Sequence, residues 1–230
     1  VGADLVVPPP SQSLSGQRQP RRGIDRDSGR FPWFGNAKYP SLSEPSPDYN
    51  GLTFAETFGD LAFTLYSHAV SLRDLGCTQS PMNAWITLNG VETLPLRMER
   101  HVENAQKVAG FLQQHPSVEW VSYAGLSSSP YYQLAQKYLQ GKAGSVFTFG
   151  IRGGYESGLR LLEKVELFSH VSNIGDSRSL ILHPASTTHR QLSDEQRLTA
   201  GAGPEVIRLS VGIESAEDLI ADLEQALEGL

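Results

Sequence analysis

The sequence predicts an α/β fold. From Val118 onward, short stretches with the two-residue period of strands alternate with stretches of helical period, which is typical of a sheet packed against helices. Before them, 81–114 has the period of a long helix. The clearest strand lies within 204–214, where Ile207, Leu209 and Val211 alternate with Val206, Arg208 and Ser210. We expect a mostly antiparallel sheet with flanking helices.

Composition excludes several classes of function. The chain has 230 residues, of which 39% are hydrophobic and 19% are charged, as in an ordinary soluble domain. Its net charge of −6 argues against nucleic acid or an anionic membrane as the main partner. No apolar run approaches the length of a membrane span. Cys77 is the single cysteine, which favours a reducing, cytoplasmic location.

The first eighty residues are predicted to contain a short strand, a proline-rich segment, a surface loop and a helical stretch. Val1–Val7 has the pattern of a turn and a short buried strand, and 8–22 is polar, basic and rich in proline, unlike a helix or central strand. A binding linker is the alternative for that segment. Residues 36–51 predict a surface loop. Residues 52–76 predict mostly helix, with apolar side chains at spacings of three and four at Leu61, Leu65, Ala69 and Leu72.

A long helix is expected to open at Ser80 and Pro81, a favoured pair for a helix start, and to run to about Gln114. Pro95 should bend it. Its predicted buried stripe is Val102, Ala105, Ala109 and Leu112. The charged residues near its middle are interpreted as a solvated or subunit-facing surface: Glu92, Arg97, Glu99 and Arg100.

The elements that follow are short. Strands are expected at 118–123 and 145–151, and helices at 130–139 and 156–164. Gly153 and Gly154 indicate a turn rather than a nucleotide-binding loop. Ser193 and Gln196 have the spacing of a capping box. The closing helix should begin near Ser215 and end before Gly229, with an apolar face of Leu219, Ile220, Leu223 and Leu227.

Arg208 and two histidines are the candidate functional side chains. An arginine on an apolar strand needs a partner, and its planar guanidinium fits a carboxylate. Arg208 can therefore bind a substrate carboxylate or form a structural ion pair, and the physics of the sequence alone favours the ion pair. His183 and His189 lie six residues apart without a third ligand, so we expect loop-fixing hydrogen bonds and no metal site.

Pro204–Glu214, together with the upstream sequence His183–His189, resembles the C-terminal part of the pyridoxal-phosphate (PLP) enzymes of cysteine and methionine metabolism, in the O-acetylhomoserine sulfhydrylase branch. The resemblance implies that Arg208 holds the α-carboxylate of an amino acid and that Asn173 approaches the substrate. It also implies a type I PLP-transferase fold. Residues 1–80 would be the end of the large PLP-binding domain with a loop insertion, and residues 81–230 the C-terminal domain.

The same resemblance shows a disrupted lysine segment. Gly2–Val7 and Asp27–Trp33 are similar to the family, and an ungapped alignment between them places Gln12 at the Schiff-base lysine. The family's phosphate-binding Ser and Thr fall on Pro9 and Ser11, which leaves Ser11 as the candidate cofactor-binding residue. Gln12 cannot form an imine, because an amide nitrogen is not a nucleophilic amine. We predict no catalytic lysine, and a frame shift across 8–26 is one hypothesis for its origin.

For an intact relative, the resemblance implies that PLP serves the conversion of O-acetylhomoserine and sulfide to homocysteine and acetate in a homotetramer. The chain does not begin with Met, which predicts a fragment or a processed product. The resemblance implies that the aspartate and the tyrosine that hold PLP in the family lie upstream of Val1 and are missing here. Four interpretations stay open: a sulfhydrylase fragment, inactive alone; a fragment of a cystathionine γ-synthase or lyase; half of a split enzyme; or an inactive paralogue that acts as a structural or regulatory subunit. Association with itself or with an intact homologue is expected.

Overall fold

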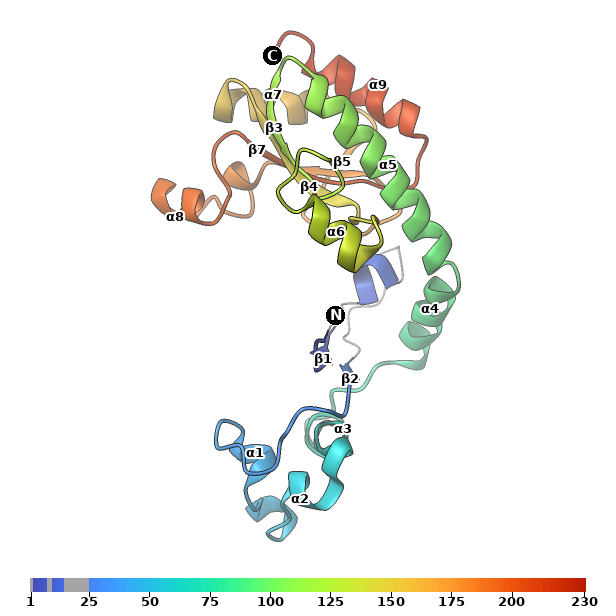
Figure 1. Cartoon of the computed structure of the whole chain (residues 1–230), viewed down its shortest axis with the longest axis vertical. Helices are drawn as coiled ribbons and strands as arrows, with labels where there is room; N and C mark the ends of the chain where they lie inside the picture. Colours follow the sequence, from blue (N-terminus) through green and yellow to red (C-terminus); the bar gives the residue numbers. More distant parts are fainter. Residues whose placement is uncertain (1, 8–9, 15–24) are drawn as a thin grey trace. The chain divides into compact units, whose positions relative to one another are not determined.

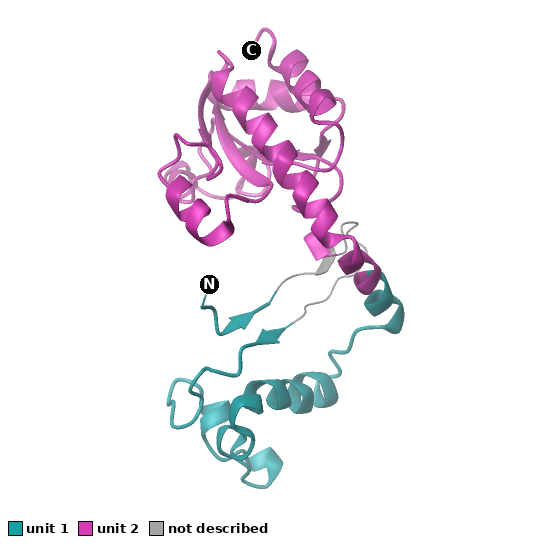
Figure 2. Cartoon of the chain, turned by 45° about the vertical axis from the view of Figure 1, so that its right-hand side comes forward, with its two compact units in different colours: residues 1–10, 20–86 teal, residues 11–19, 87–230 magenta. Residues whose placement is uncertain are grey.

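A computed structural model describes residues 2–7, 10–14 and 25–230 of the chain. The chain divides into two compact units, which we describe separately (Figure 2). The first contains residues 1–10 and 20–86, and the second contains residues 11–19 and 87–230. The second unit carries Arg208, Asn173 and Gln12, and therefore all the candidate site residues considered below.

The first unit has a small β-ribbon and a helical part. Strand β1 (Leu5–Val6) pairs antiparallel with β2 (Arg26–Asp27). Val6 and Val7 are 44% and 62% exposed, so the strand predicted there forms but is not buried. Trp33 is buried in an aromatic cluster with Phe31, Tyr39 and Phe63.

The helical pattern of 52–76 forms several short pieces instead of one helix. After α1 (Pro40–Ser43) come α2 (Phe54–Phe58), a 3-10 turn, α3 (Ala62–Tyr66) and a π-helical stretch, Ser67–Asp74. Asn50 and Gly51, both with positive φ, lie between α1 and α2, and Gly59 ends α2 and begins the 3-10 turn. Phe54, Ala55 and Ala62 form the buried side, whereas Leu61 and Leu72 of the predicted stripe are exposed.

The predicted long helix is two helices, α4 (Pro81–Glu92) and α5 (Leu94–Gln114). Ser80 caps α4, because its Oγ accepts a hydrogen bond from the amide of Asn83 at 3.2 Å. Pro95 lies in the first turn of α5, where its missing N–H costs nothing, so it starts a helix instead of bending one. Ala105, Ala109 and Leu112 are buried as predicted, whereas Val102 is only half-buried.

A five-stranded sheet forms the centre of the second unit, in the order β3-β4-β7-β6-β5 (Figure 1). All neighbouring pairs are antiparallel except β5 and β6, which confirms the mostly antiparallel sheet. The central strand β7 pairs with β4 on one side and with β6 on the other. The strands are β3 (Val118–Ser122), β4 (Val146–Ile151), β5 (Ser169–His170), β6 (Leu180–Leu182) and β7 (Val206–Ser210).

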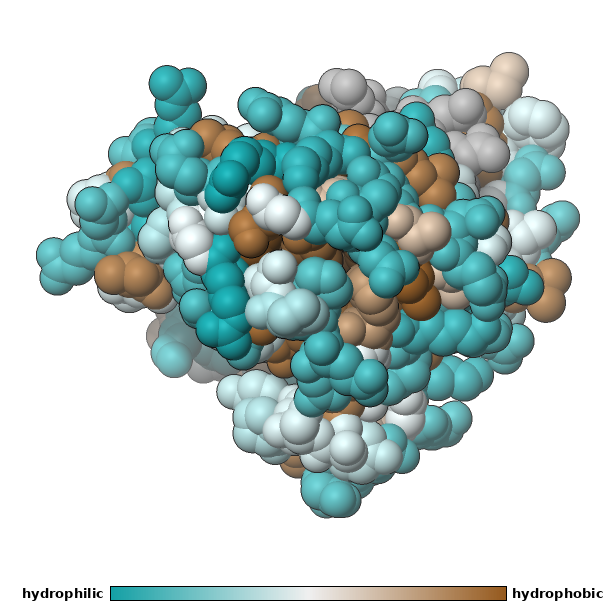
Figure 3. All heavy atoms as spheres, turned by 90° about the horizontal axis from the view of Figure 1, so that it is seen from above, coloured by the Kyte–Doolittle hydropathy of each residue, from teal (hydrophilic) through white to brown (hydrophobic). Residues whose placement is uncertain are grey.

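Helices cover this sheet and complete an α/β fold. The remaining helices are α6 (Tyr132–Leu139), α7 (Gly154–Lys164), α8 (Asp194–Thr199) and α9 (Ala216–Leu227). Helix α7 contacts β4 and β7, α5 contacts β3, and α9 packs on both α5 and α7. The core between them includes Phe149, Ile207, Leu209, Leu219 and Leu223, all fully buried. Hydrophilic residues dominate the face drawn in Figure 3.

Local sequence signals explain several boundaries. The capping box of α8 forms in full, since Ser193 and Gln196 each accept a hydrogen bond from the other's amide. Gly153 and Gly154 both have positive φ, at 87° and 62°, and make the predicted turn before α7. Strands β5 and β6 have no counterpart among the predicted strands.

Candidate functional site

Arg208 lies in the middle of the central strand. It is paired in register with Thr148 of β4 and Leu182 of β6. Its four neighbours within β7 are buried, whereas Arg208 itself is half-buried. The strand thus fixes the backbone of Arg208 on both sides and leaves its guanidinium within reach of solvent.

The guanidinium of Arg208 has donors to spare. Its Nη2 donates a hydrogen bond to the main-chain carbonyl of Asn173 at 3.4 Å. Burial lowers the pKa of Arg208, but an arginine stays charged in proteins. No carboxylate pairs with it among the residues that the structure describes. The structural ion pair favoured by sequence physics is therefore not formed within that part of the chain, and the unused donors suit a bidentate anion.

The loop of Asn173 is fixed to the same strand. The amide of Gly175 donates a hydrogen bond to Oγ of Ser210 at 2.9 Å, two residues beyond Arg208. Gly175 has a φ of 69° and is buried. A Cβ on Gly175 would collide with Oγ of Ser13 and would lie 2.8 Å from the amide nitrogen of Ser13. Only a glycine lets the loop and the Ser13 segment approach this closely.

Residues 10–14, which include Ser13 and are called the Gln12 segment below, contain the position that the resemblance assigns to the lysine. Residues 10–14 form a π-helical turn that is interrupted at Gln12, where φ is −94° and ψ is −125°. A helical turn was not predicted in this proline-rich stretch. The side chain of Gln12 is half-buried. Pro9 lies outside the described residues, as does the side chain of Ser11, the candidate cofactor-binding residue.

Arg97 corrects the prediction of a solvated or subunit-facing charge. It is half-buried near the start of α5, and its guanidinium donates to the carbonyls of Ser13 at 2.7 Å and Leu14 at 3.0 Å. Burial lowers its pKa. The reason for the error is that its partners are main-chain oxygens more than eighty residues away, which leave no side-chain signal in the sequence.

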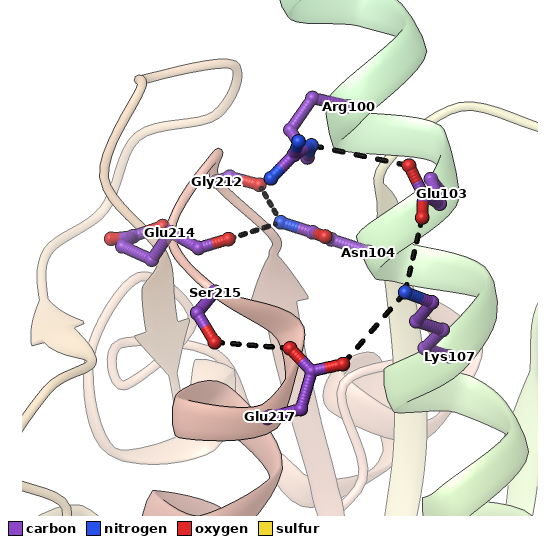
Figure 4. Close-up of polar contacts among 8 residues, drawn as sticks. All are labelled: Arg100, Glu103, Asn104, Lys107, Gly212, Glu214, Ser215 and Glu217. Atoms are coloured by element: carbon purple, nitrogen blue, oxygen red, sulfur yellow. Dashed lines mark hydrogen bonds and ion pairs between the residues drawn. The ribbon is translucent and has the colours of Figure 1, made fainter.

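Two further polar residues of α5 follow Arg97 at helical spacing. His101 Nδ1 donates to the carbonyl of Val211 at 2.6 Å. Asn104 Nδ2 donates to the carbonyls of Gly212 at 3.0 Å and Glu214 at 2.8 Å (Figure 4). Both side chains are buried. The spacing of 97, 101 and 104 is one stripe of a helix, and it is the signal that could have identified this polar face.

The outer surface of α5 carries ordinary ion pairs. Glu103 pairs with Lys107 at 3.0 Å and with Arg100 at 3.9 Å (Figure 4). Lys107 also lies 3.9 Å from a carboxylate oxygen of Glu217 on α9. These side chains are exposed, so each pair contributes little stability. The solvated-surface prediction therefore holds for Arg100.

Glu214 ties the segment after β7 to the loop of Asn173. Its carboxylate accepts hydrogen bonds from the amide of Ser179 at 2.7 Å and from Oγ of Ser179 at 3.0 Å. The amide of Gly212 donates to Ser179 Oγ at 2.8 Å. The loop that contains Asn173 and Gly175 is thus fixed to the C-terminal end of β7 at Ser210 and to the segment that follows it at Gly212 and Glu214.

The predicted loop-fixing role of His183 agrees with its contacts. Nε2 donates to the carbonyl of Pro204 at 2.9 Å, and Nδ1 accepts from Oγ of Ser186 at 3.0 Å. Burial lowers the pKa of His183, which favours the neutral ring, and a neutral ring that donates from Nε2 accepts at Nδ1. His189 is held locally through Nδ1 and Oγ1 of Thr188 at 2.9 Å. Within the described residues, no group of three or more metal-ligating side chains occurs.

These contacts define a candidate anion-binding site on an α/β domain. Arg208 supplies the charge, the Asn173 loop lies beside it, and Ser13 of the Gln12 segment lies against Gly175 of that loop. Elsewhere, Cys77 is an exposed free thiol. None of the helices in the described ranges is long and apolar enough to cross a bilayer.

The chain belongs to the Cys/Met metabolism PLP-dependent enzyme family, whose model matches residues 2–228. It is 48% identical over 226 residues to O-acetyl-L-homoserine sulfhydrylase 1 of Thermus thermophilus, covering 98% of this chain and 53% of that protein. It is also 48% identical to the O-acetyl-L-homoserine sulfhydrylase of Leptospira meyeri over 238 residues, covering 100% of this chain and 54% of that protein. The chain spans about half the length of these curated relatives.

A solved structure supports the same assignment. The crystal structure of a putative O-acetylhomoserine (thiol)-lyase from Campylobacter jejuni matches with a TM-score of 0.92 and 40% identity. The match covers 99% of this chain and 54% of that one. That protein carries a pyridoxyl-lysine 5′-monophosphate residue, which agrees with PLP as the cofactor of the family.

The residues present here do not fit covalently bound PLP. The chain has five lysines, and none lies in the Gln12 segment or beside Arg208: Lys38, Lys107, Lys137, Lys142 and Lys164. An amide at position 12 cannot supply the amine that an imine requires. The candidate site thus contains the arginine that the resemblance singles out, whereas position 12 holds a glutamine and no amine nucleophile.

Proposed function

We propose that this chain forms the substrate-carboxylate side of an O-acetylhomoserine sulfhydrylase site and has no lysine-dependent turnover of its own. Arg208 would hold the α-carboxylate of the amino acid, with the Asn173 loop beside it. The observation that carries the proposal is the half-buried guanidinium of Arg208, which has only a carbonyl for a partner among the described residues. The relatives named O-acetyl-L-homoserine sulfhydrylase support the substrate.

The geometry explains why this arginine would bind and orient a substrate. A carboxylate can accept two parallel hydrogen bonds from a guanidinium, which fixes its direction as well as its position. Strand β7 lies in the centre of the sheet, so Arg208 is held by ladders on both sides. The Asn173 carbonyl orients the other edge of the guanidinium. The domain therefore offers a prepared anion site without supplying a reactive group.

Titration with O-acetyl-L-homoserine, followed by NMR of the Arg208 side chain and the Gly175 amide, tests the proposal. We expect saturable shifts with the amino acid and none with its methyl ester, which lacks the carboxylate. R208Q should abolish the shifts, whereas R178Q, a change at an exposed arginine that pairs with Asp176, should keep them. Equal binding of acid and ester, or binding by R208Q, would refute the proposal.

The predicted inactivity has its own test. The purified chain is incubated with PLP, O-acetyl-L-homoserine and sulfide, and homocysteine is measured. We expect none above the rate without protein, because no lysine is available at position 12. A protein-dependent rate would overturn the proposed inactivity.

Association with an intact relative is a second candidate function. Exposed apolar residues around the junction of α4 and α5 favour it, among them Leu88 at 65% and Leu96 at 70% exposure. Co-elution of the chain with the Thermus thermophilus relative on a sizing column would support this role. Elution as a separate species at micromolar concentration would count against it.

The free thiol of Cys77 supports a reducing compartment such as the cytoplasm.

A further inference from the structure

We propose that Arg97 is a positioning residue that fixes the main chain directly after position 12, through the carbonyl oxygens of Ser13 and Leu14. The contacts of Arg97 do not depend on the proposed function. Their meaning for catalysis in an intact relative does rest on it, because position 12 matters only where a lysine occupies it.

The hydrogen bonds of Arg97 are directed at backbone. Nη1 donates to the carbonyl of Ser13 at 2.7 Å, and Nη2 donates to the carbonyl of Leu14 at 3.0 Å. Nη2 also donates to the carbonyl of Gly90 at 2.6 Å, and Nε donates to Oγ1 of Thr93 at 3.2 Å. The guanidinium is rigid and planar, and it therefore connects the end of α4 to the Gln12 segment.

The segment has a second contact, at Ser13. Gly175 lies against the backbone of Ser13, so closely that a Cβ would not fit, and the amide of Gly175 is bound to Ser210. The segment thus contacts both α5 and the loop attached to β7. Gln12 has dihedral angles outside the helical region within this turn. A chain held on two sides can sustain such a conformation, because the neighbouring contacts determine it.

The arrangement links position 12 to the substrate side of the site. Arg97 and His101 lie on the same stripe of α5, and His101 binds the carbonyl of Val211 just beyond β7. Helix α5 therefore positions both the backbone after position 12, through Arg97, and the strand that carries Arg208, through His101. Lysine cannot replace Arg97, since one ammonium on a flexible stem cannot reach three carbonyls in a plane.

A nitroxide spin label at position 12 tests this role. The label is attached to Q12C in a C77S background, so that no other thiol reacts, and its mobility is measured by electron paramagnetic resonance. In the labelled protein that keeps Arg97, we expect the spectrum of an immobilised label. In R97K, we expect the immobilised component of the spectrum to be lost. The matched control is R100K on the same helix, because the one ion pair of Arg100 among the described residues joins it to an exposed carboxylate at 3.9 Å. R100K should keep the immobilised spectrum.

Thermal unfolding of each labelled variant separates positioning from general stability. We expect R97K to keep a cooperative transition while the label becomes mobile. Identical spectra for R97K and its parent would overturn the proposal. Loss of cooperative unfolding in R97K would also overturn it, because Arg97 would then stabilise the whole domain. Substrate binding at Arg208 is read separately by NMR, so failure of one proposal is distinguishable from failure of the other.

Discussion

His101 donates a hydrogen bond from Nδ1 to the carbonyl oxygen of Val211 at a distance of 2.6 Å. A neutral imidazole that donates from Nδ1 carries its lone pair on Nε2. The Nε2 atom is buried and has no hydrogen-bond partner within the described part of the chain. Protonation of His101 would therefore place an unpaired charge in the core, and burial accordingly lowers its pKa.

Stability should fall in mild acid because of His101. The unfolded chain takes up a proton near pH 6.5, whereas the folded chain resists it, so stability is complete above 6.5 and is lost as the pH falls through the lowered pKa of the folded state. We expect a loss of about 1 kcal/mol from this residue between pH 7.5 and 5.5, measured as the change in free energy of unfolding by urea.

The control for this pH effect is H101N. Asparagine keeps a donor near the position of Nδ1 but does not titrate in this range. His183, whose pKa burial also lowers, is present in both proteins, so its effect cancels in the comparison. Equal pH dependence in H101N and in the unchanged chain would show that His101 is not the sensor.

Local sequence signals were sufficient for the elements around the site. The period of two in 204–214 predicted β7, which forms at Val206–Ser210 between β4 and β6. The apolar spacing after Ser215 predicted α9, and Leu219, Leu223 and Leu227 are fully buried. Both patterns are local, because the same face of one element repeats along the chain. The resemblance to the family then predicted the α/β fold that the structure shows.

The parts that could not be predicted depend on main-chain partners. Arg97 binds carbonyls far away in sequence, and a carbonyl is offered by every residue type. The approach of Gly175 to Ser13 leaves no sequence signal other than a glycine. The short helices of 54–74 reflect tertiary packing around Trp33 and Phe54, which overrides the helical period of the sequence. The sequence signal that does exist is the stripe of polar residues on α5, formed by Arg97, His101 and Asn104.

Asn104→Ala should destabilise the second unit by about 2 kcal/mol. The change removes two hydrogen bonds and leaves the carbonyls of Gly212 and Glu214 without their donor in a buried place. Urea denaturation at pH 7.5 measures the loss. Gln106→Ala, a change at an exposed residue two positions further along α5, should stay within about 0.5 kcal/mol of the parent. A similar loss in both variants would contradict the role of Asn104.

Asp222 anchors the turn that leads into β5. Its carboxylate accepts hydrogen bonds from the amides of Glu166 at 2.8 Å, Leu167 at 2.9 Å and Phe168 at 3.1 Å. Asp222→Ala should cost about 3 kcal/mol, since three amides lose a charged acceptor. Glu224→Ala, at an exposed position of the same helix, should be nearly neutral.

Amide hydrogen exchange provides the local check on Asp222. The amides of 166–168 should exchange faster in Asp222→Ala, with smaller changes in β3, which lies at the opposite edge of the sheet. Unchanged exchange at 166–168 would mean that the turn holds without the carboxylate.

Gly212→Ala should lower stability, whereas Gly110→Ala should raise it. A Cβ at position 212 would collide with the carbonyl oxygen of Ser177 and with the carboxylate of Glu214, and would lie 2.6 Å from the carbonyl carbon of Arg178. Backbone atoms cannot move aside cheaply, so we expect a loss of at least about 2 kcal/mol. At Gly110, inside α5, a Cβ meets nothing within 4 Å, and alanine should add up to about 1 kcal/mol through its higher helix propensity. If the segment after β7 is packed this closely, differential scanning calorimetry should give a lower Tm for Gly212→Ala and a higher Tm for Gly110→Ala. A Gly212→Ala variant as stable as its parent would show that the segment after β7 can move away from Ser177 in the Asn173 loop.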